Sequence, residues 1–142
     1  MIYINFHQYV YICLLYGLTK VAYPDGKYVQ YGYDQYYRLT SVQTPYGTDT
    51  YSYDELNRPV KVVDKNGYAT IYSYDANGNR SEVKYANGIT VTYSYDELNR
   101  LTEEKAVDKN GICVASYKYS LGKSGERIRA EELDRTVEYT YD

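Results

Sequence analysis

Apolar and polar residues alternate over short segments that recur along the chain. In residues 89–95 the odd positions are Ile, Val, Tyr and Tyr, whereas the residues between them are Thr, Thr and Ser. A period of two is typical of a β-strand that buries one of its faces. The pattern therefore predicts a strand at 89–95 whose two tyrosines lie on the same face.

Turn signals stand on both sides of each predicted strand. A glycine in a Pro-Asp-Gly, Lys-Asn-Gly or Ala-Asn-Gly setting precedes the strand, and such settings allow a positive φ. The sequence Asp-x-x-Asn-Arg follows the strand at residues 54–58 and 96–100, where Asp can bond to the backbone downstream and Asn tolerates the left-handed region. A second, less regular strand is expected after this turn, at residues 38–42, 58–62, 80–84 and 100–104. The unit of two strands and two turns predicts an all-β meander of tandem antiparallel hairpins.

This unit repeats. The motif Tyr-x-Tyr-Asp starts at residues 31, 51, 72, 93 and 139, a degenerate copy starts at residue 117, and the steps between the six are 20, 21, 21, 24 and 22. We therefore divide the chain into an atypical N-terminal segment, residues 1–17, and six repeats over residues 18–142, of which the one at 117–138 is degenerate. The residues to which we assign a structural role in the repeat are Tyr31, Tyr33, Asp34, Arg38, Tyr51, Tyr53, Asp54, Arg58, Gly67, Tyr72, Tyr74, Asp75, Arg80, Gly88, Tyr93, Tyr95, Asp96, Arg100, Gly111, Tyr117, Tyr119, Tyr139, Tyr141 and Asp142.

Two places depart from the regular spacing. Arg80 follows the first tyrosine of its repeat by eight residues, one more than the other arginines, so we expect a turn with one inserted residue at 75–79. The distance from Gly111 to Tyr117 is six residues where the other repeats have five, which shifts the alternation. We expect a β-bulge or a wider turn there.

The charge of the chain narrows the classes of partner. Its 142 residues include 16 basic and 19 acidic side chains, and no run of Lys or Arg occurs. Nucleic acids and anionic membrane surfaces require clustered positive charge, so we expect neither as a partner. The apolar run at residues 10–18 is too short to cross a bilayer and lacks the basic start and small-residue end of a signal peptide. We expect a strand there, or the start of a fragment of a longer reading frame.

Few residues suit catalysis or metal binding. The chain has a single histidine, His7, and its two cysteines, Cys13 and Cys113, lack any zinc-ligand spacing or partner histidine. Residues 75–79 resemble the start of a calcium loop, but Arg80 stands where Gly is required and Ala86 where the bidentate Glu belongs. We predict no cofactor, no metal and no enzymatic activity.

The repeat, Gly-x-x-x-x-Tyr-x-Tyr-Asp-x-x-x-Arg-Leu in its complete form, resembles the YD repeat of the Rhs family over residues 18–142. Members of that family include bacterial Rhs polymorphic toxins, wall-associated proteins, the cocoon-forming subunits of insecticidal Tc toxin complexes and animal teneurins. The resemblance implies β-hairpins in a long, curved sheet that spirals into a hollow shell. In the family such a shell encloses a toxin or serves as an extracellular scaffold.

The resemblance also implies where the chain acts and with what. A secreted or cell-surface location is expected, with further YD repeats or a longer Rhs-type chain as partner. The Asp-Pro-x-Gly motifs of the family's self-cleaving core do not occur here, so autoproteolysis and toxicity are not carried over. Six repeats are far fewer than a closed shell needs, and we therefore expect the chain to be a fragment.

Three hypotheses for function remain. The first is a structural scaffold, in which tyrosine pairs fill one sheet face and Asp–Arg pairs four or five residues apart brace the turns (Asp34 with Arg38, Asp54 with Arg58, Asp75 with Arg80, Asp96 with Arg100). The alternative is a carbohydrate-binding module, in which rows of tyrosines stack on sugars and groups such as Asp54 and Asn57 hold their hydroxyls. The third, a hydrolase with two carboxylates, is the weakest, because every repeated Asp already has a role in a turn. Open sheet edges also predict self-association.

Overall fold

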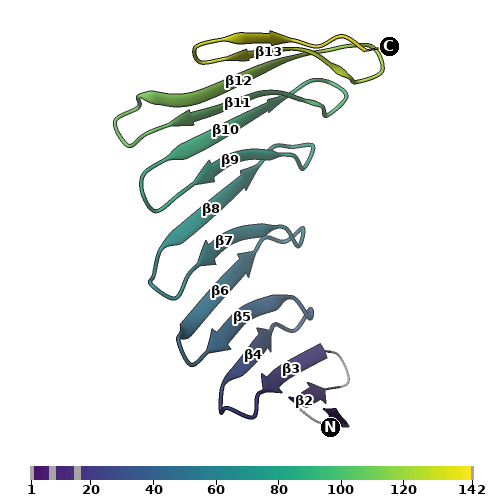
Figure 1. Ribbon diagram of the computed structural model, residues 1–142, viewed down its shortest axis with the longest axis vertical. Helices are drawn as coiled ribbons and strands as arrows, with labels where there is room; N and C mark the ends of the chain where they lie inside the picture. Colours follow the sequence, from purple (N-terminus) through teal and green to yellow (C-terminus); the bar gives the residue numbers. More distant parts are fainter. Residues whose placement is uncertain (1, 7–8, 15–16, 142) are drawn as a thin grey trace. The chain divides into compact units, whose positions relative to one another are not determined.

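The regular structure of this chain is built from β-strands alone in the residues that the computed structural model describes, 2–6, 9–14 and 17–141 (Figure 1). The chain divides into two compact units, Met1–Ala69 and Thr70–Asp142. In each unit the strands follow one another in chain order and neighbouring strands run antiparallel. The all-β meander that the alternation predicts is thereby confirmed.

The first unit contains seven strands. Each pairs with the next along the chain, from the pair Ile2↔Cys13 in the first hairpin to the pair Tyr53↔Pro59 in the last. Their bounds are β1 Ile2–Phe6, β2 Tyr9–Leu14, β3 Gly17–Ala22, β4 Tyr28–Tyr33, β5 Leu39–Thr44, β6 Gly47–Tyr53 and β7 Pro59–Val63. Pro59 stands at the start of its strand, where a missing backbone donor is tolerated.

The second unit repeats this plan from β8, which begins at the boundary residue Ala69. Its hairpins close through five-residue turns except the last, where the Glu132 N–H donates to the Arg135 carbonyl. The strands again pair only with sequence neighbours within the unit. The bounds are β8 Ala69–Tyr74, β9 Arg80–Lys84, β10 Thr90–Tyr95, β11 Leu101–Val107, β12 Cys113–Leu121, β13 Arg127–Glu132 and β14 Thr136–Glu138.

Most of the described hairpins close through one kind of five-residue turn. In residues 54–58 the Asp54 N–H donates to the Arg58 carbonyl at 3.0 Å and the Asn57 N–H donates to the Asp54 carbonyl at 3.1 Å. The fourth residue is left-handed, with φ 63° at Asn57 and 85° at Gly67 in the equivalent turn on the other side of the sheet. The Asp…Arg turns lie along one side of each unit and the Asn-Gly turns along the other (Figure 1). The expectation of left-handed Asn and Gly at these places is confirmed.

One face of each sheet is apolar and aromatic, and the other is polar. The register places Tyr72 beside Val83 and Val83 beside Val91, so these side chains form a row across three strands. In β10 Thr92 and Ser94 are exposed, whereas the tyrosines that alternate with them are half-buried. Among the described side chains only Val21, Val83, Val91 and Ala130 are fully buried. The tyrosine face is therefore covered mainly by its own rings, because no second layer packs on it within either unit.

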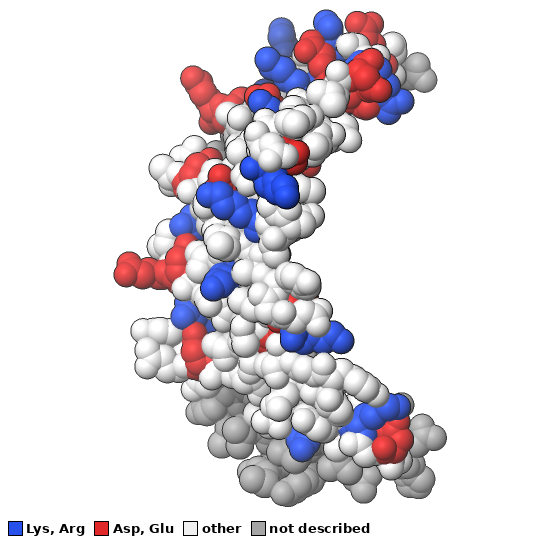
Figure 2. Space-filling model, turned by 90° about the vertical axis from the view of Figure 1, so that its left-hand side faces the viewer, with Lys and Arg blue, Asp and Glu red and all other residues white. Residues whose placement is uncertain are grey.

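Charges of both signs are mixed on the surface. Viewed from the side of the Asn-Gly turns, Lys and Arg side chains are interspersed with Asp and Glu, and no large area of one sign occurs on the part of the chain shown there (Figure 2). Examples on the described strands are the exposed pairs of Lys84 with Glu82 and of Arg129 with Glu131. This mixed surface agrees with the absence of basic runs in the sequence.

A β-bulge follows every described Asp-side turn, and the sequence pattern did not predict it. Tyr53 pairs with Pro59 but Ser52 pairs with Lys61, so Val60 has no partner residue opposite it. The same single-residue shift occurs after Tyr33, Tyr74, Tyr95 and Leu121. The bulge predicted between Gly111 and Tyr117 is also present, because Val107 pairs with Cys113 and Ala106 with Ala115, which leaves Val114 extra. The turn before it has the usual length.

The degenerate repeat lies two residues later than the motif suggests. Gly122, not Ser120, begins the five-residue turn, because its N–H donates to the Glu126 carbonyl at 2.8 Å. Leu121 pairs with Arg127 as Tyr53 pairs with Pro59. Tyr119 therefore takes the place of the first tyrosine of the motif and Leu121 that of the second. The Val114 bulge accounts for one extra residue, and β12 as a whole has nine residues where β4, β8 and β10 have six each, so the Tyr-x-Tyr match at 117–119 ends before the turn begins.

Candidate functional site: the row of Asp turns

Five turns lie along one side of the sheet, at residues 34–38, 54–58, 75–79, 96–100 and 122–126, and are called the Asp turns. An Asp side chain at the first position organises all of them except the last, which begins with Gly122. In residues 54–58, Asp54 Oδ1 accepts hydrogen bonds from the backbone N–H groups of Leu56 and Arg58, both at 2.9 Å, and Asp54 Oδ2 accepts from Arg58 Nε at 2.7 Å. The turns that begin at Asp34 and Asp96 have the same three bonds. Both oxygens of these carboxylates are thus engaged inside the turn.

The bonds favour the ionised form of the carboxyl groups. For Asp54 and Asp96 the backbone N–H of the residue four positions on, and then its guanidinium group, hold the pKa of the carboxyl below its usual value. At Asp108, in a turn on the other side of the sheet, the N–H of Ile112 lowers the pKa in the same way. These carboxyl groups are therefore ionised near neutral pH and act as hydrogen-bond acceptors within their turns.

The predicted pair of Asp75 with Arg80 is wrong. The turn at 75–79 has no inserted residue, because the Asp75 N–H donates to the Asn79 carbonyl as in the other turns. Asn79 occupies the fifth position and donates its Nδ2 to Asp75 Oδ2 at 3.1 Å. Arg80 is the first residue of β9, and its guanidinium lies over the ring of Tyr72 at 5.2 Å. Arg80 therefore lies just outside the turn, and its neighbour Asn79 takes the fifth position.

The arginine at the fifth position of a turn also donates hydrogen bonds to the next turn along the chain. Arg38 Nη1 donates to the carbonyl oxygen of Asp54 at 3.0 Å and to Asn57 Oδ1 at 2.9 Å. Arg100 Nη1 donates to the carbonyl oxygen of Gly122 at 3.1 Å. The guanidinium thus binds its own carboxylate with one side and the following turn with the other. The sequence spacing predicted the first contact and gave no sign of the second.

The second tyrosine of the motif makes a further bond between repeats. The hydroxyl of Tyr53 donates to the carbonyl oxygen of Leu39 at 2.9 Å, and the Leu39 carbonyl follows directly after the preceding turn. Equivalent bonds join Tyr33 to Leu18, Tyr95 to Arg80 and Tyr141 to Arg127. Sequence reasoning assigned these tyrosines to packing alone; their hydroxyls also bind the neighbouring repeat.

The first tyrosine of the motif has a different environment. Tyr31, Tyr51 and Tyr72 each lie opposite a valine of the next strand. Burial raises the pKa of the Tyr93 and Tyr119 hydroxyls. The guanidinium of Arg127 lies 3.8 Å from the centre of the Tyr119 ring, as Arg80 lies over Tyr72. These rings therefore act as packing surfaces and as partners for cations.

The remaining predicted residues are turn glycines and the last copy of the motif. Gly67, Gly88 and Gly111 all have a φ between 82° and 86°. Tyr117 lies on β12 opposite Glu104 and Glu132. Tyr139 lies just after β14, where its N–H donates to the Ile128 carbonyl at 3.0 Å. The predictions for Asp142, His7 and the side chain of Cys13 fall outside the described part of the chain.

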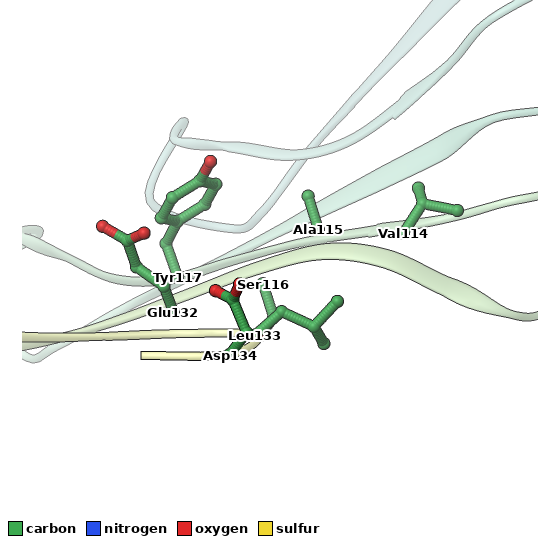
Figure 3. A pocket seen from close by; sticks show the side chains of 7 residues that line it. All are labelled: Val114, Ala115, Ser116, Tyr117, Glu132, Leu133 and Asp134. Carbon is green, nitrogen blue, oxygen red and sulfur yellow. The ribbon is translucent and has the colours of Figure 1, made fainter. Parts of the chain in front are cut away.

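Two shallow hollows occur on the described surface. One, of about 540 Å³, lies between consecutive Asp turns and is lined by Tyr36, Arg38, Tyr53, Asp54, Glu55 and Asn57. The other, of about 260 Å³, lies where the Val114 bulge meets the turn between β13 and β14, with Tyr117 and Glu132 on one side and Leu133 on the other (Figure 3). In the first hollow the polar groups of Arg38, Asp54 and Asn57 already bind one another.

Among the described residues, no group of three His, Cys, Asp or Glu side chains is placed to hold a metal ion. None of the segments in this part of the chain is a helix long and apolar enough to cross a membrane. Cys113 is a half-buried free cysteine.

Comparison with known proteins identifies the repeat. The RHS repeat family matches residues 17–49, 53–90 and 74–110. A search of curated protein sequences found no match. Similar solved structures include TcdB2-TccC3 without its hypervariable C-terminal region, with a TM-score of 0.78 and 16% identity over 95% of this chain and 9% of that chain. The complex TcdB2-TccC3-Cdc42 has a TM-score of 0.75 and 15% identity over 88% of this chain and 8% of that one.

A third similar structure is the Tc holotoxin pore of Photorhabdus luminescens, with a TM-score of 0.73 and 14% identity over 92% of this chain and 8% of that chain. At these identities the likeness concerns the fold. The chain spans less than a tenth of the length of each of these three solved chains. The family match covers more than half of the chain and coincides with the Asp turns and tyrosine bonds described above, and the chain therefore belongs to the RHS repeat family.

Proposed function

We propose that this chain is a structural segment of a larger RHS repeat shell and has no activity of its own. The observation that carries the proposal is the use made of its polar side chains. In the Asp turns, carboxylates, guanidinium groups and tyrosine hydroxyls bind their own turn or the neighbouring repeat. Such groups hold repeats together and are not left free for a substrate, as expected when each repeat is stabilised by its neighbours.

The shell would enclose a toxin or form a scaffold at the cell surface. The similar structures support the first form, since they are of TcdB2-TccC3-Cdc42, of TcdB2-TccC3 without its hypervariable C-terminal region and of a Tc holotoxin pore. A secreted or cell-surface location is part of the same proposal. The mixed surface charge in Figure 2 suits a wall that contacts varied cargo without strong attraction of one sign.

The partners proposed are further RHS repeats. Strand β1 of the first unit and strand β14 of the second each pair with one strand of their own unit only. An edge strand presents unpaired backbone donors and acceptors that another strand can bind. The edges therefore fit repeats of a longer chain, and in the isolated protein they favour self-association.

A hybrid protein tests the scaffold role. The segment of TcdB2-TccC3 that matches this chain would be replaced by residues 17–141, and the product examined by electron microscopy. We expect a closed shell, because the fold and the strand order agree. A control hybrid would carry another RHS repeat segment of equal length. A closed shell from the control together with an open or aggregated product from this chain would refute the proposal.

Carbohydrate binding is the second candidate function. The hollow between the first two Asp turns contains an exposed Tyr36 ring, which is 65% exposed and suits stacking on a sugar. The groups expected to hold sugar hydroxyls give less support, because Asp54 accepts three bonds within its turn and Asn57 accepts from Arg38. A glycan array decides between the two: binding that is lost in Tyr36→Ala would favour the module, and no binding would favour the scaffold.

A further inference from the structure

The contacts between consecutive Asp turns follow a rule that the motif does not state. In three of them, from 34–38 to 54–58, from 75–79 to 96–100 and from 96–100 to 122–126, the residue at the fifth position of the first turn donates a hydrogen bond to the next turn. Where that next turn has Asn at its fourth position, the Asn side-chain oxygen is the acceptor: Arg38 donates to Asn57 Oδ1 at 2.9 Å and Asn79 donates to Asn99 Oδ1 at 2.9 Å. Asn99 Oδ1 also accepts from Asn77 Nδ2, at the third position of the same turn as Asn79, at 3.1 Å. The donors differ, but the acceptor is the same group in the same place.

The backbone does not explain why Asn stands there. The fourth position is left-handed in all these turns, with φ 63° at Asn57 and 59° at Asn99, but also 90° at Gly78 and 89° at Gly125. Gly adopts this conformation at no steric cost, so it would serve the turn alone at least as well as Asn. The side-chain oxygen is what Asn adds. In the two pairs described, that oxygen is used by the preceding repeat.

Arg100 and Gly125 occupy the same two positions but do not form this bond. Arg100 Nη1 reaches only the carbonyl oxygen of Gly122, since the fourth residue of that turn has no side chain. A Cβ atom at Gly125 would lie 3.9 Å from Arg100 Nη1 and 3.8 Å from its Cδ, in open van der Waals contact. A carboxamide at this position would therefore have room beside the guanidinium and could accept from it.

We propose that the fifth residue of one Asp turn and the fourth residue of the next form a recognition pair that selects which repeat stacks on which. Arg or Asn at the fifth position recognises Asn at the fourth position of its neighbour. The inference rests on the proposed role of the chain as a set of stacked repeats. It adds that the fourth residue is a specificity-determining position rather than a turn former.

The surroundings of Arg38 make the pair selective. Its side chain is 22% exposed and lies between the rings of Tyr36 and Tyr53, whose centres are 5.2 Å and 5.0 Å from the guanidinium carbon. Its Nε is held by Asp34. Asp34 and Tyr36 belong to the same turn as Arg38, whereas Tyr53 belongs to the following repeat, so Nη1 is oriented jointly by its own turn and by the repeat that carries its acceptor. A mismatched fourth residue would leave a partly desolvated donor without this bond.

A double-mutant cycle in the full chain tests the pair. The unfolding equilibrium in urea would be measured for wild type, Arg38→Ala, Asn57→Gly and the double variant. Arg38→Ala also removes the ion pair with Asp34, but that loss cancels in the cycle. We expect Asn57→Gly to raise the unfolding equilibrium constant about tenfold in the wild-type background, and by much less in the Arg38→Ala background. If the fold-changes of the two single variants multiply to that of the double variant within about twofold, the residues are not coupled and the proposal is wrong.

Installing the pair where it is missing gives a second test. Gly125 has φ 89°, so a Cβ there strains the backbone and Gly125→Asn should destabilise the chain. The loss should be about threefold or more smaller in the wild-type background than in Arg100→Ala, because only in the wild type can the new carboxamide accept a hydrogen bond from Arg100. An equal effect in both backgrounds would contradict the proposal. Hydrogen exchange supplies an independent readout, since Arg38→Ala should speed exchange of the Asn57 amide in the next repeat more than Arg58→Lys does.

The outcome is separable from that of the proposed function. A coupled pair in a hybrid that forms no shell would refute the scaffold role and leave the recognition pair. A closed shell with uncoupled residues would refute the recognition pair alone. In both cases the measured quantity belongs to this chain and requires no unidentified ligand.

Discussion

The hydroxyl of Tyr53 donates a 2.9 Å hydrogen bond to the carbonyl oxygen of Leu39, fourteen residues earlier in the chain. Leu39 begins the strand after one Asp turn, and Tyr53 ends the strand before the next. The bond therefore joins two consecutive repeats at the side of the sheet where the Asp turns lie. Three other tyrosines at the same motif position make the same bond, so it is a regular element of the repeat.

Removing this hydroxyl should cost stability, whereas removing that of Tyr51 should not. Tyr53→Phe deletes the donor to Leu39 and is expected to lower the free energy of unfolding by about 1 kcal/mol. In Tyr51→Phe the ring and its packing beside Val62 are kept, and within the described structure its hydroxyl donates no hydrogen bond. Urea unfolding of both variants measures the difference. Equal losses would show that the bond to Leu39 contributes nothing.

Two turn glycines with the same backbone conformation should differ in their tolerance of alanine. Gly88 and Gly111 have φ 86° and 82°, so a Cβ costs about 1–2 kcal/mol at either. At Gly88 the added Cβ would also stand 2.8 Å from Cβ of Lys109, whereas at Gly111 no atom lies within 4 Å. Gly88→Ala should therefore lose about 1–3 kcal/mol more than Gly111→Ala in urea unfolding. The control is Lys109→Gly, which should remove most of this excess.

Tyr37 is the one position of the Asp turns where replacement should stabilise the chain. It occupies the fourth, left-handed position with φ 62°, where the other turns have Asn or Gly. A bulky residue in this region is strained, and Asn tolerates it better. We expect Tyr37→Asn to raise the free energy of unfolding by about 1 kcal/mol. The reciprocal change Asn57→Tyr should lower it, and a gain from both substitutions would be inconsistent with backbone strain as the cause.

Acid should destabilise the protein through its Asp turns. Backbone N–H groups and the arginine at the fifth position lower the pKa of Asp54 and Asp96 below the usual 3.8. A carboxyl whose pKa is lowered by folding stabilises the folded state above its unfolded pKa, and this stabilisation is lost as pH falls through the folded value. The urea midpoint should therefore be nearly constant from pH 7 to about 5 and fall below about pH 4.

The variant Asp96→Asn isolates one of these carboxyls. Asn can still accept the N–H of Leu98 and Arg100 through its oxygen, but it cannot be ionised and offers no charge to the guanidinium. We expect a lower midpoint than wild type at pH 7 and a smaller difference at pH 3. A difference that stays constant between the two pH values would assign the loss to shape instead of charge.

The strands and turns were predicted correctly from the sequence because each depends on residues only a few positions apart. The alternation in residues 89–95 predicted β10, and the Asp-x-x-Asn-Arg and Asn-Gly sequences predicted turns with left-handed fourth residues. These features depend on neighbours within a few positions, such as an Asp oxygen that accepts two N–H groups of its own turn. The bulge at Val114 was also visible in advance, since an extra residue changes the period of the strand.

Spacing alone misled at two sites. Arg80 was paired with Asp75 because the other repeats have an arginine near that place, but the turn has a constant length and Asn79 fills its fifth position. The degenerate repeat was placed two residues too early because Tyr117 and Tyr119 match the motif, whereas the turn begins only at Gly122, after a strand of nine residues. In both cases the sequence shows how many residues separate two motifs, but it does not show which residue of one strand pairs with which residue of the next.

The sequence by itself determined the strands, the turns, the two faces of the sheet and membership of a repeat family, because each follows from a short pattern repeated about every 21 residues. Only the tertiary structure decided which groups join one repeat to the next. The contacts of Tyr53 with Leu39 and of Arg38 with Asn57 depend on the register between strands and on a bulge after each turn. A shift of one residue turns each side chain to the other face, so these contacts exist only once the whole ladder is assembled.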